Sequence, residues 1–289
     1  MFRNRSFKAP MIVISTTFIG IMLVLPLISV IVNAFSKGMA FYIDALSTNE
    51  VIYALRLTLF VTFITVSVNS IFGLIASWAL TRFTFRGRQL VITLIDIPFS
   101  VSPVIAGLAF LMMFGRMGWA NPIVESVNAI TGWSIKIVFA VPGVVLATIF
   151  VTFPFVLREL VPVLNADGAQ EEEAAAIMGA SGITIFRRIT FPRVKWAFMY
   201  GVVLCTARAL GEFGAVNALS KARGKTFTLP LEIDALYMSG SADSIVAAYA
   251  VSSVLVILAV VMLIIRNYFE NKTKHTKEPL EVTESLVED

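Results

Sequence analysis

Residues 164–196 read LNADGAQEEEAAAIMGASGITIFRRITFPRVKW and make up most of the longest polar interruption, 161–196, in an otherwise apolar chain. Asp167 can cap the start of a helix. Gln170, three residues on, can accept a hydrogen bond from the backbone N–H of Asp167 in return. Three glutamates and three alanines then favour helix, and Gly179 is expected to end it. Ser181 can cap a second short helix, which Pro192 is expected to close. The stretch predicts a rigid projection of two short helices at a glycine elbow, called the knob below (residues 161–196).

The composition of the whole chain is that of a membrane protein. Of its 289 residues, 57% are apolar and 15% are charged, whereas average soluble domains hold roughly 45–50% apolar and 25% charged residues. This excludes an ordinary cytosolic enzyme and a disordered protein. With one cysteine, Cys205, and one histidine, His275, a disulfide framework is excluded and a zinc or iron–sulfur site lacks ligands.

Six stretches are long and apolar enough to cross a bilayer, which takes about 20 residues. They are residues 11–33, 57–80, 90–114, 137–156, 197–219 and 245–265. The first is too long for the core of a signal peptide and no small-x-small cleavage site follows it, so it is expected to be retained. We predict an all-α integral membrane protein with six transmembrane helices. Residues 1–10 would form a cytoplasmic N-terminus, residues 11–266 the transmembrane domain and residues 267–289 a cytoplasmic polar tail.

The distribution of lysine and arginine sets the orientation. With the N-terminus inside, 15 of these residues fall in inner segments and 7 in outer ones. An even number of spans then places both termini and the knob in the cytoplasm. The outer cluster Lys221, Arg223 and Lys225 goes against this rule; it is either a tolerated short loop or a positive rim that attracts an anion.

An amphipathic helix lying on the lipid surface is the simpler alternative for the knob. Three consecutive glutamates argue against it, because anionic lipid headgroups would repel them. A stiff cytoplasmic projection can instead transmit force between a soluble partner and the membrane spans.

The knob resembles the EAA loop of the membrane subunits of binding-protein-dependent ABC importers. The pattern is EAA-x-x-x-G, nine further residues, then I-x-F-P, with Phe191 where the family usually has leucine. Its positions here are Glu173, Ala174, Ala175, Gly179, Ile189 and Pro192. The resemblance implies that these residues couple to an ATPase subunit by docking into a cleft on it.

The same resemblance implies the rest of an assembly in a bacterial inner membrane. The chain would have a core of five helices preceded by one added N-terminal helix. Its partners would be a second permease subunit, homologous or identical, two copies of a cytoplasmic ATPase subunit, and an extracytoplasmic anion-binding protein. ATP and Mg would bind the ATPase. This chain would bind no cofactor, metal or nucleic acid and would catalyse no reaction.

Polar groups at membrane depth are costly and point to function. In the third span Pro98 and Pro103 interrupt the helix, and Ser100 and Ser102 lie between them. A broken helix is tolerated where it is buried or lines water, and its new N-terminal end favours anions. Ser100, Ser102 and Pro103 are therefore candidates for a translocation path; the alternative is a proline kink that serves packing.

The fifth predicted span carries Arg208 and Glu212, one helical turn apart. Such a pair lowers the cost of placing both charges in the membrane. Gly211 and Gly214 allow close helix approach. Arg208 and Glu212 are predicted to line or gate the path. The alternatives are small-residue packing alone, or an Arg208 that extends to the cytoplasmic interface.

Residues 98–107 and 208–215, together with Thr228-Leu229-Pro230-Leu231, resemble the sulfate and molybdate branch of these permeases. The chain length and the additional first span resemble the sulfate/thiosulfate permease subunits of the W type. A tetrahedral oxyanion, sulfate or thiosulfate, is the expected cargo, and molybdate or tungstate is the alternative.

Two classes of function compete with an ATP-driven importer subunit. A stand-alone secondary anion carrier would need more intramembrane acids for ion coupling than Asp96 and Glu212, and it leaves the knob unexplained. An intramembrane enzyme would need a matched catalytic pair at membrane depth, and the sequence offers none.

Overall fold

The computed structural model describes the backbone of residues 5–285 and the side chains of residues 10–270. Residues 1–4 and 286–289 and the side chain of His275 lie outside this part. Every regular element in the described range is a helix, which confirms the predicted all-α class. The helices are α1 (Arg5–Ala34), α2 (Gly38–Leu46), α3 (Asn49–Arg82), α4 (Arg88–Ser100), α5 (Pro103–Phe114), α6 (Asn121–Thr131), α7 (Val141–Thr152), α8 (Pro154–Asp167), α9 (Gln170–Ile177), α10 (Gly182–Ile185), the π-helical turn η1 (Phe186–Thr190), α11 (Phe191–Leu210), α12 (Gly214–Leu219), α13 (Leu229–Met238) and α14 (Ala242–Ser285).

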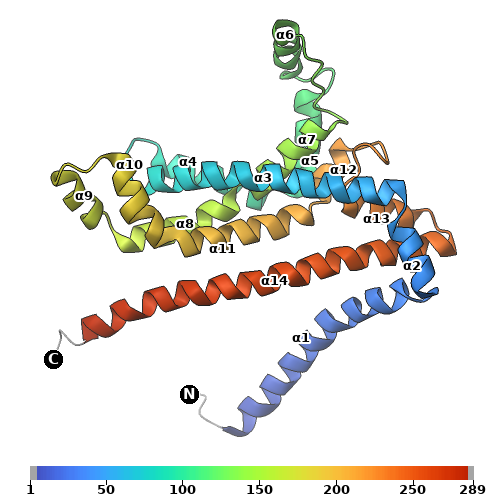
Figure 1. Cartoon of the computed structure of the whole chain (residues 1–289), viewed down its shortest axis with the longest axis horizontal. Coiled ribbons are helices and arrows are strands. Elements are labelled where there is room, and N and C mark those ends of the chain that lie inside the picture. The colour runs from blue at the N-terminus through green and yellow to red at the C-terminus, as the bar shows by residue number, and fades with distance from the viewer. Residues whose placement is uncertain (1–4, 286–289) are drawn as a thin grey trace.

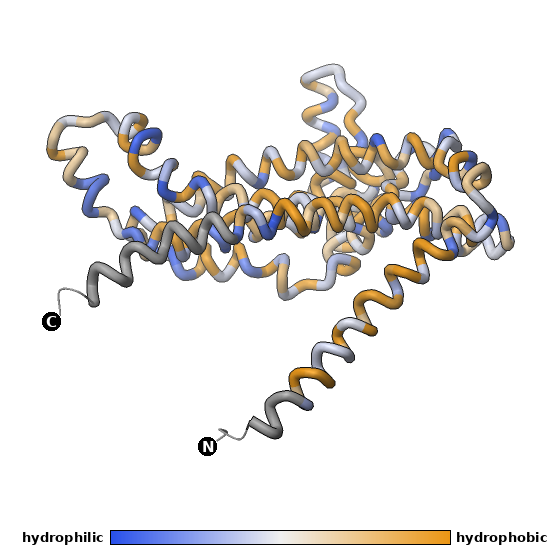
Figure 2. The backbone as a smooth tube through the Cα atoms, turned by 60° about the horizontal axis from the view of Figure 1, so that its bottom comes forward, coloured by the Kyte–Doolittle hydropathy of each residue, from blue (hydrophilic) through white to orange (hydrophobic). Residues whose placement is uncertain are grey.

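The helices form an elongated bundle (Figure 1). In it α3, α8 and α11 pack on one another, and α14 runs beside α11. The 34 residues of α3 span about 50 Å at 1.5 Å per residue. The knob helices α9 and α10 project from the end at which α3 finishes and toward which α14 runs. Hydrophilic residues gather around this end, whereas α1 and the body of the bundle are mostly hydrophobic (Figure 2).

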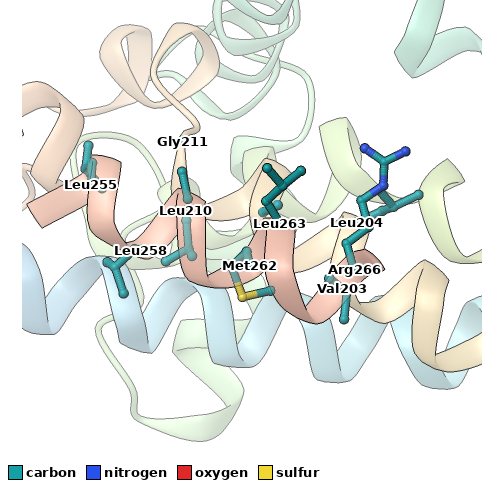
Figure 3. A pocket seen from close by; sticks show the side chains of 11 residues that line it. Val203, Leu204, Leu210, Gly211, Leu255, Leu258, Met262, Leu263 and Arg266 are labelled. Carbon is teal, nitrogen blue, oxygen red and sulfur yellow. The ribbon is translucent and has the colours of Figure 1, made fainter. Parts of the chain in front are cut away.

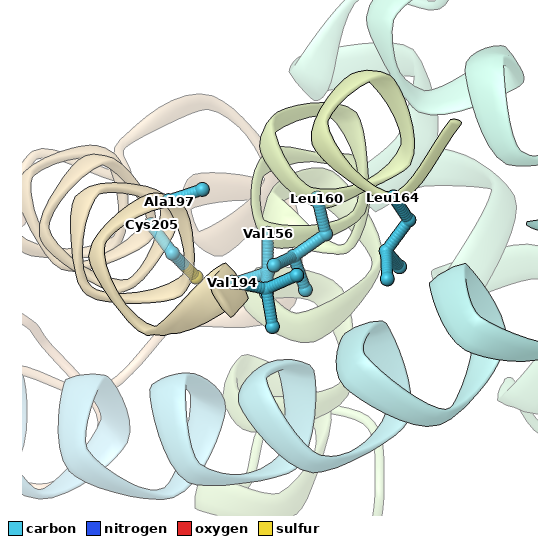
Figure 4. Close-up of a cluster of buried hydrophobic side chains, with 6 residues drawn as sticks. All are labelled: Val156, Leu160, Leu164, Val194, Ala197 and Cys205. Carbon is cyan, nitrogen blue, oxygen red and sulfur yellow. The ribbon is translucent and has the colours of Figure 1, made fainter. Parts of the chain in front are cut away.

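The core joins α8 to α11 (Figure 4). Val156, Leu160 and Leu164 of α8 belong to one cluster of buried side chains. The residues that meet them are Val194, Ala197 and Cys205. The helix α3 also approaches α8 closely, because a Cβ on Gly73 would lie 3.0 Å from the side chain of Val156. Small residues at such contacts favour helix association in membranes, where apolar burial drives little.

In the part of the chain that the structure describes, four helical stretches are long and apolar enough to cross a membrane. They are Pro10–Ala34, Asn49–Arg82, Val141–Asp167 and Ala242–Glu270. They correspond to the first, second, fourth and sixth predicted spans. The third predicted span is the pair Arg88–Ser100 and Pro103–Phe114, which is bent by 107° and adds a fifth span only if the pair is counted as one.

The predicted count of six helices is therefore not confirmed. The fifth predicted span, 197–219, is not a single helix, because α11 ends at Leu210 and α12 begins only at Gly214. The helix α11 carries the basic residues Arg193, Lys195 and Arg208 within its 20 residues, and it is not among the four candidate spans. The last helix, α14, runs from Ala242 to Ser285 and so includes most of the predicted tail, 267–289.

Candidate functional site

The elbow of the knob has the geometry that the sequence predicts at Gly179. Gly179 has φ of +86°, a conformation that glycine adopts readily and other residues do not. Its N–H donates to the carbonyl of Ala176 at 3.0 Å, and the N–H of Ala180 donates to that of Ala175 at 3.0 Å. These two bonds form a Schellman motif, which ends α9 and turns the chain sharply.

The start of α9 differs from the prediction. Asp167 does not cap this helix; it is the last residue of α8, and the residue at the cap of α9 is Ala169, with no side-chain hydrogen bond. The chain turns at Gly168, which has φ of +67°. Leu160 and Leu164 pack in the core, and α8 stays helical through Asp167, so Asp167 does not have the extended backbone that a residue at a helix N-cap needs.

The second knob helix begins as predicted but does not end as predicted. Ser181 caps α10 by accepting from the N–H of Thr184 at 3.4 Å. Pro192 does not close this helix, because the chain continues through η1 directly into α11. In η1 the N–H of Phe191 donates to the carbonyl of Phe186, five residues back. The wider turn makes room for the proline ring, which a regular helix interior would not accommodate.

The three consecutive glutamates have three different environments. Glu172 forms a two-pronged ion pair with Arg82 at the end of α3, with Nε–Oε2 of 2.8 Å and Nη2–Oε1 of 3.0 Å. Glu171 pairs with Arg193 at the surface. Glu173 is exposed, and among the described side chains it has no hydrogen-bond or ion-pair partner. The Arg82 contact was not predicted, because nothing in a sequence links residues 90 positions apart.

An apolar patch surrounds the elbow. Ile177 is 88% exposed, Met178 80% and Ile183 82%. Of the motif positions, Glu173, Ala174, Gly179 and Pro192 are exposed, Ile189 is half-buried and Ala175 is buried. Exposed apolar groups rimmed by charge are typical of a protein-binding surface. This elbow patch (Ile177, Met178 and Ile183) adds three residues that the motif alone did not identify.

The helix break predicted in the third span is confirmed and is sharp. It falls between Pro98, inside α4, and Pro103, in the first turn of α5. Ser100 and Ser102 are both exposed at the bend, and in the described part of the chain neither hydroxyl has a hydrogen-bond partner. Ser102 sits at the cap position of α5 without bonding to it.

The two segments that carry the branch resemblance pack on each other through α5 and α12. A Cβ at Gly107 would lie 2.5 Å from the carbonyl oxygen of Ala215, and one at Gly214 would lie 3.0 Å from Cβ of Pro103. Gly107 has no room for a side chain, and a Cβ at Gly214 would be in tighter contact than is usual. The predicted close approach is therefore found at Gly214 but not at Gly211, whose Cβ would meet only a carbonyl at 3.9 Å.

Arg208 and Glu212 form the predicted ion pair, with Nη1–Oε2 of 2.5 Å. The side chain of Glu212 is 1% exposed and that of Arg208 is 31% exposed. Glu212 also accepts from the N–H of Ala215 at 2.8 Å, at the start of α12. Arg208 lies near the end of α11, about 25 Å along the helix from Phe191 at 1.5 Å per residue.

One residue of the basic cluster Lys221, Arg223 and Lys225 is engaged in an ion pair within the chain. Arg223 binds Glu232, a fully buried residue of α13, through Nε–Oε1 of 2.8 Å and Nη2–Oε1 of 2.5 Å. This hydrogen bonding raises the pKa of Arg223. Lys221 and Lys225 stay exposed, so only two of the three charges remain available for a positive rim.

An apolar groove of about 270 Å³ lies between α11 and α14 (Figure 3). Leucines and Met262 line it, and Arg266 stands at one end. The guanidinium of Arg266 donates to the Tyr200 hydroxyl at 3.3 Å and lies 3.9 Å from Glu270. The groove offers no polar groups along its length that would hold an anion. Within the described side chains, no group of three His, Cys, Asp or Glu residues is placed to bind a metal ion.

Curated proteins similar to this chain are sulfate permeases. The sulfate transport system permease protein CysW of Escherichia coli (strain K12) is 43% identical over 261 residues, which cover 89% of this chain and 87% of that protein. CysW of Synechocystis sp. is 42% identical over 271 residues, covering 93% and 95%. The sulfate transport system permease protein CysT of Salmonella typhimurium is 34% identical over 202 residues, covering 70% and 71%.

The fold is also that of solved importers. A bacterial ABC transporter involved in the import of the acidic polysaccharide alginate superposes with a TM-score of 0.74 at 17% identity, covering 93% of this chain and 95% of that one. The alginate transporter in complex with a pentasaccharide-bound periplasmic protein gives 0.71 at 18% identity, covering 93% and 94%. The family described as binding-protein-dependent transport system inner membrane component matches residues 69–275, more than two thirds of the chain. This chain therefore belongs to that family of membrane components of binding-protein-dependent transport systems.

Proposed function

We propose that this chain is a membrane subunit of an ATP-driven importer for sulfate or thiosulfate. The observation that carries the proposal is the knob: an elbow with an exposed apolar patch and an exposed Glu173, tied to the end of α3 by the ion pair of Glu172 with Arg82. The CysW relatives favour sulfate over molybdate or tungstate as cargo. A stand-alone carrier is disfavoured, because it would have no use for such a projection.

The knob is the docking site for a cytoplasmic ATPase subunit. The coupling residues would be Glu173, Ala174, Ala175, Gly179, Ile189 and Pro192, with the elbow patch filling the cleft. Ala175 is buried against the chain itself, so its role is to hold the knob in shape. ATP and Mg bind the ATPase, and this chain hydrolyses nothing.

A second permease subunit completes the path across the membrane. The likeness to CysT as well as CysW favours a homologous partner over an identical copy. Two ATPase copies attach inside. An extracytoplasmic binding protein delivers the anion, as the solved alginate complex with a periplasmic protein suggests. The path candidates are Ser100, Ser102, Pro103, Arg208 and Glu212, because they lie at or beside two helix breaks, one between α4 and α5 and one between α11 and α12, and α5 packs on α12.

The chain lies in a bacterial inner membrane with both termini in the cytoplasm. Residues 11–266 form the transmembrane domain, between residues 1–10 and the tail 267–289. In this topology α11 and the bent pair α4–α5 each serve as a crossing. The positive-inside distribution supports this orientation, as does the position of α9 at the end of the bundle toward which α14 runs.

The direct test of cargo and energy source is uptake in a strain lacking this chain. Restoring the chain is expected to restore uptake of labelled sulfate. Thiosulfate is expected to compete with this uptake, whereas the same concentration of molybdate is not. Uptake is expected to stop when cellular ATP is depleted. An affinity tag on the chain is expected to recover a soluble ATPase. Stronger competition by molybdate would favour the oxyanion alternative, and uptake that survives ATP depletion would favour the carrier.

The orientation is tested by cysteine labelling. Ser181 is exposed in the knob and Lys221 is exposed in the predicted outer loop, while the native Cys205 is buried. In a Cys205→Ser background, Ser181→Cys is expected to react with a membrane-impermeant maleimide only after the cells are opened. Lys221→Cys serves as the matched control and is expected to react in intact cells. Labelling of Ser181→Cys in intact cells would reverse the topology.

A further inference from the structure

The helix that would meet the ATPase is weakly attached to the rest of the chain. Glycines with left-handed backbone, Gly168 and Gly179, stand at its two ends with φ of +67° and +86°. Ala175 is the one residue of α9 that is buried. Backbone hinges at both ends and little packing would let α9 pivot under load. A movement of the ATPase would then rotate α9 without moving the other helices, unless another contact holds α9 in place.

That contact is the ion pair between Arg82 and Glu172. Their side chains are only 10% and 14% exposed, so the pair is shielded from solvent. The Thr190 hydroxyl donates to Oε1 of Glu172 at 2.8 Å. The Arg82 guanidinium also donates through Nη1 to the carbonyl of Leu164, at 2.9 Å. One cluster of side chains thus joins α9 to the end of α3, to the end of α8 and to η1.

The helices to which this cluster ties α9 are themselves firmly connected to one another. α3 and α8 are in close contact at Gly73 and Val156. Further along α3, the amide of Asn69 donates to the Thr152 hydroxyl of α7 at 2.8 Å. Near the far end, the Thr58 hydroxyl accepts from the N–H of Leu229 at 2.7 Å, at the start of α13. A displacement delivered to Arg82 therefore acts on α3, α7 and α8 together, over the length of the bundle.

The neighbouring glutamates lack this arrangement. Glu171 is 59% exposed and pairs with Arg193, which is 38% exposed. Surface pairs of this kind contribute little. Glu173 is exposed. The three consecutive carboxylates therefore differ: Glu171 forms a surface ion pair, Glu172 forms a shielded ion pair, and Glu173 is exposed.

We propose that Arg82 and Glu172 form a coupling strut, which transmits movement of α9 to α3 and α8 and which positions the knob rather than contacting ATP or anion. The inference rests on the proposed function, since it assumes that an ATPase moves α9. Without the strut, α9 is expected to stay docked on the ATPase and to pivot at its glycine hinges. ATP hydrolysis would continue while transport fails.

The test uses the complete transporter, reconstituted into proteoliposomes with its ATPase, partner permease and binding protein. Labelled sulfate uptake and ATP hydrolysis are measured on the same vesicles. Glu172→Gln and Arg82→Gln are each expected to lower sulfate taken up per ATP hydrolysed by about fivefold or more, in the range of a broken allosteric coupling. Co-purification of the ATPase is expected to stay at the wild-type level. Glu171→Gln is the matched control and is expected to leave the ratio unchanged.

The double variant Arg82→Gln with Glu172→Gln separates transmission from folding. It removes both charges, so neither is left buried without a partner, and its thermal stability in detergent is expected to recover toward wild type. If the pair is a strut, uptake per ATP stays low in this variant, and no lower than in the single variants. Recovery of uptake along with stability would overturn the proposal, as would an unchanged ratio in the single variants or loss of the ATPase from the double variant. Absence of ATP-driven sulfate uptake in the wild-type vesicles would instead reject the proposed function itself.

Discussion

Gly179→Val is expected to abolish anion uptake while leaving the chain in the membrane at its normal level. Gly179 has φ of +86°, and valine in a left-handed conformation costs about 1–2 kcal/mol or more. The chain would relieve this strain by rotating the elbow, which breaks the two hydrogen bonds that end α9. The elbow patch, which lies on both sides of Gly179, would then change its arrangement relative to α9. Uptake of labelled sulfate, normalised to the amount of chain in membranes, measures the effect.

The control for Gly179→Val lies three residues away. Gly182 is in the first turn of α10 with an ordinary φ, and a Cβ there would meet nothing within 4 Å. Gly182→Val adds the same side chain to the same loop and is expected to retain most uptake. Gly179→Asn is expected to fall between the two, because asparagine tolerates the left-handed region better than valine. Full uptake in Gly179→Val would mean that the shape of the elbow does not matter for coupling.

The parts of the knob that could be predicted from sequence are those fixed by local hydrogen bonds. Gly179 and Ser181 act within a few residues of their own position, and the structure confirms both. Asp167 and Pro192 obey equally good local rules, and both predictions were wrong. In the first case, α8 packs in the core through Leu164 and stays helical through Asp167, so this residue does not cap the next helix. In the second, a π-helical turn accommodates the proline ring. Local preference was overruled where packing or a backbone adjustment offered an alternative.

The pairing of Arg82 with Glu172 could not be predicted at all. In the sequence Arg82 is one of several cationic residues in an inner segment, and its charge supports only the topology. Its role depends on α3 ending beside α9, which is a consequence of how α3 packs on α8. By contrast, the pair of Arg208 with Glu212 lies within one helical turn, so spacing alone predicted it.

The membrane crossings show the same division between local and tertiary information. Average hydropathy finds stretches of sufficient length but does not register a break inside them. Pro98 and Pro103 predicted the break in the third span; its angle of 107° did not follow from them. That angle accompanies the contact of Gly107 with Ala215, and the contact brings together residues that are far apart in the sequence.

Arg208→Ala is expected to lower transport by roughly tenfold, the effect of about 1.4 kcal/mol, and to lower assembly less. The side chain of Glu212 is 1% exposed and would keep only its bond from Ala215 as compensation. Breaking a buried ion pair costs about 3–5 kcal/mol. Because Arg208 is 31% exposed, the loss of stability is expected to lie below that range. Sulfate uptake and thermal stability of the detergent-purified complex are to be measured on the same preparations.

Arg208→Ala combined with Glu212→Gln distinguishes an arginine that serves the path from one that only neutralises Glu212. The glutamine oxygen can still accept from the N–H of Ala215, so α12 keeps its first hydrogen bond and no charge is left buried. Stability is therefore expected to recover in the double variant. If the guanidinium attracts or steers the anion, uptake remains low despite that recovery, since the positive charge is still missing. Uptake that returns to the wild-type level together with stability would assign Arg208 to packing alone, and the path would then have to be sought at Ser100 and Ser102.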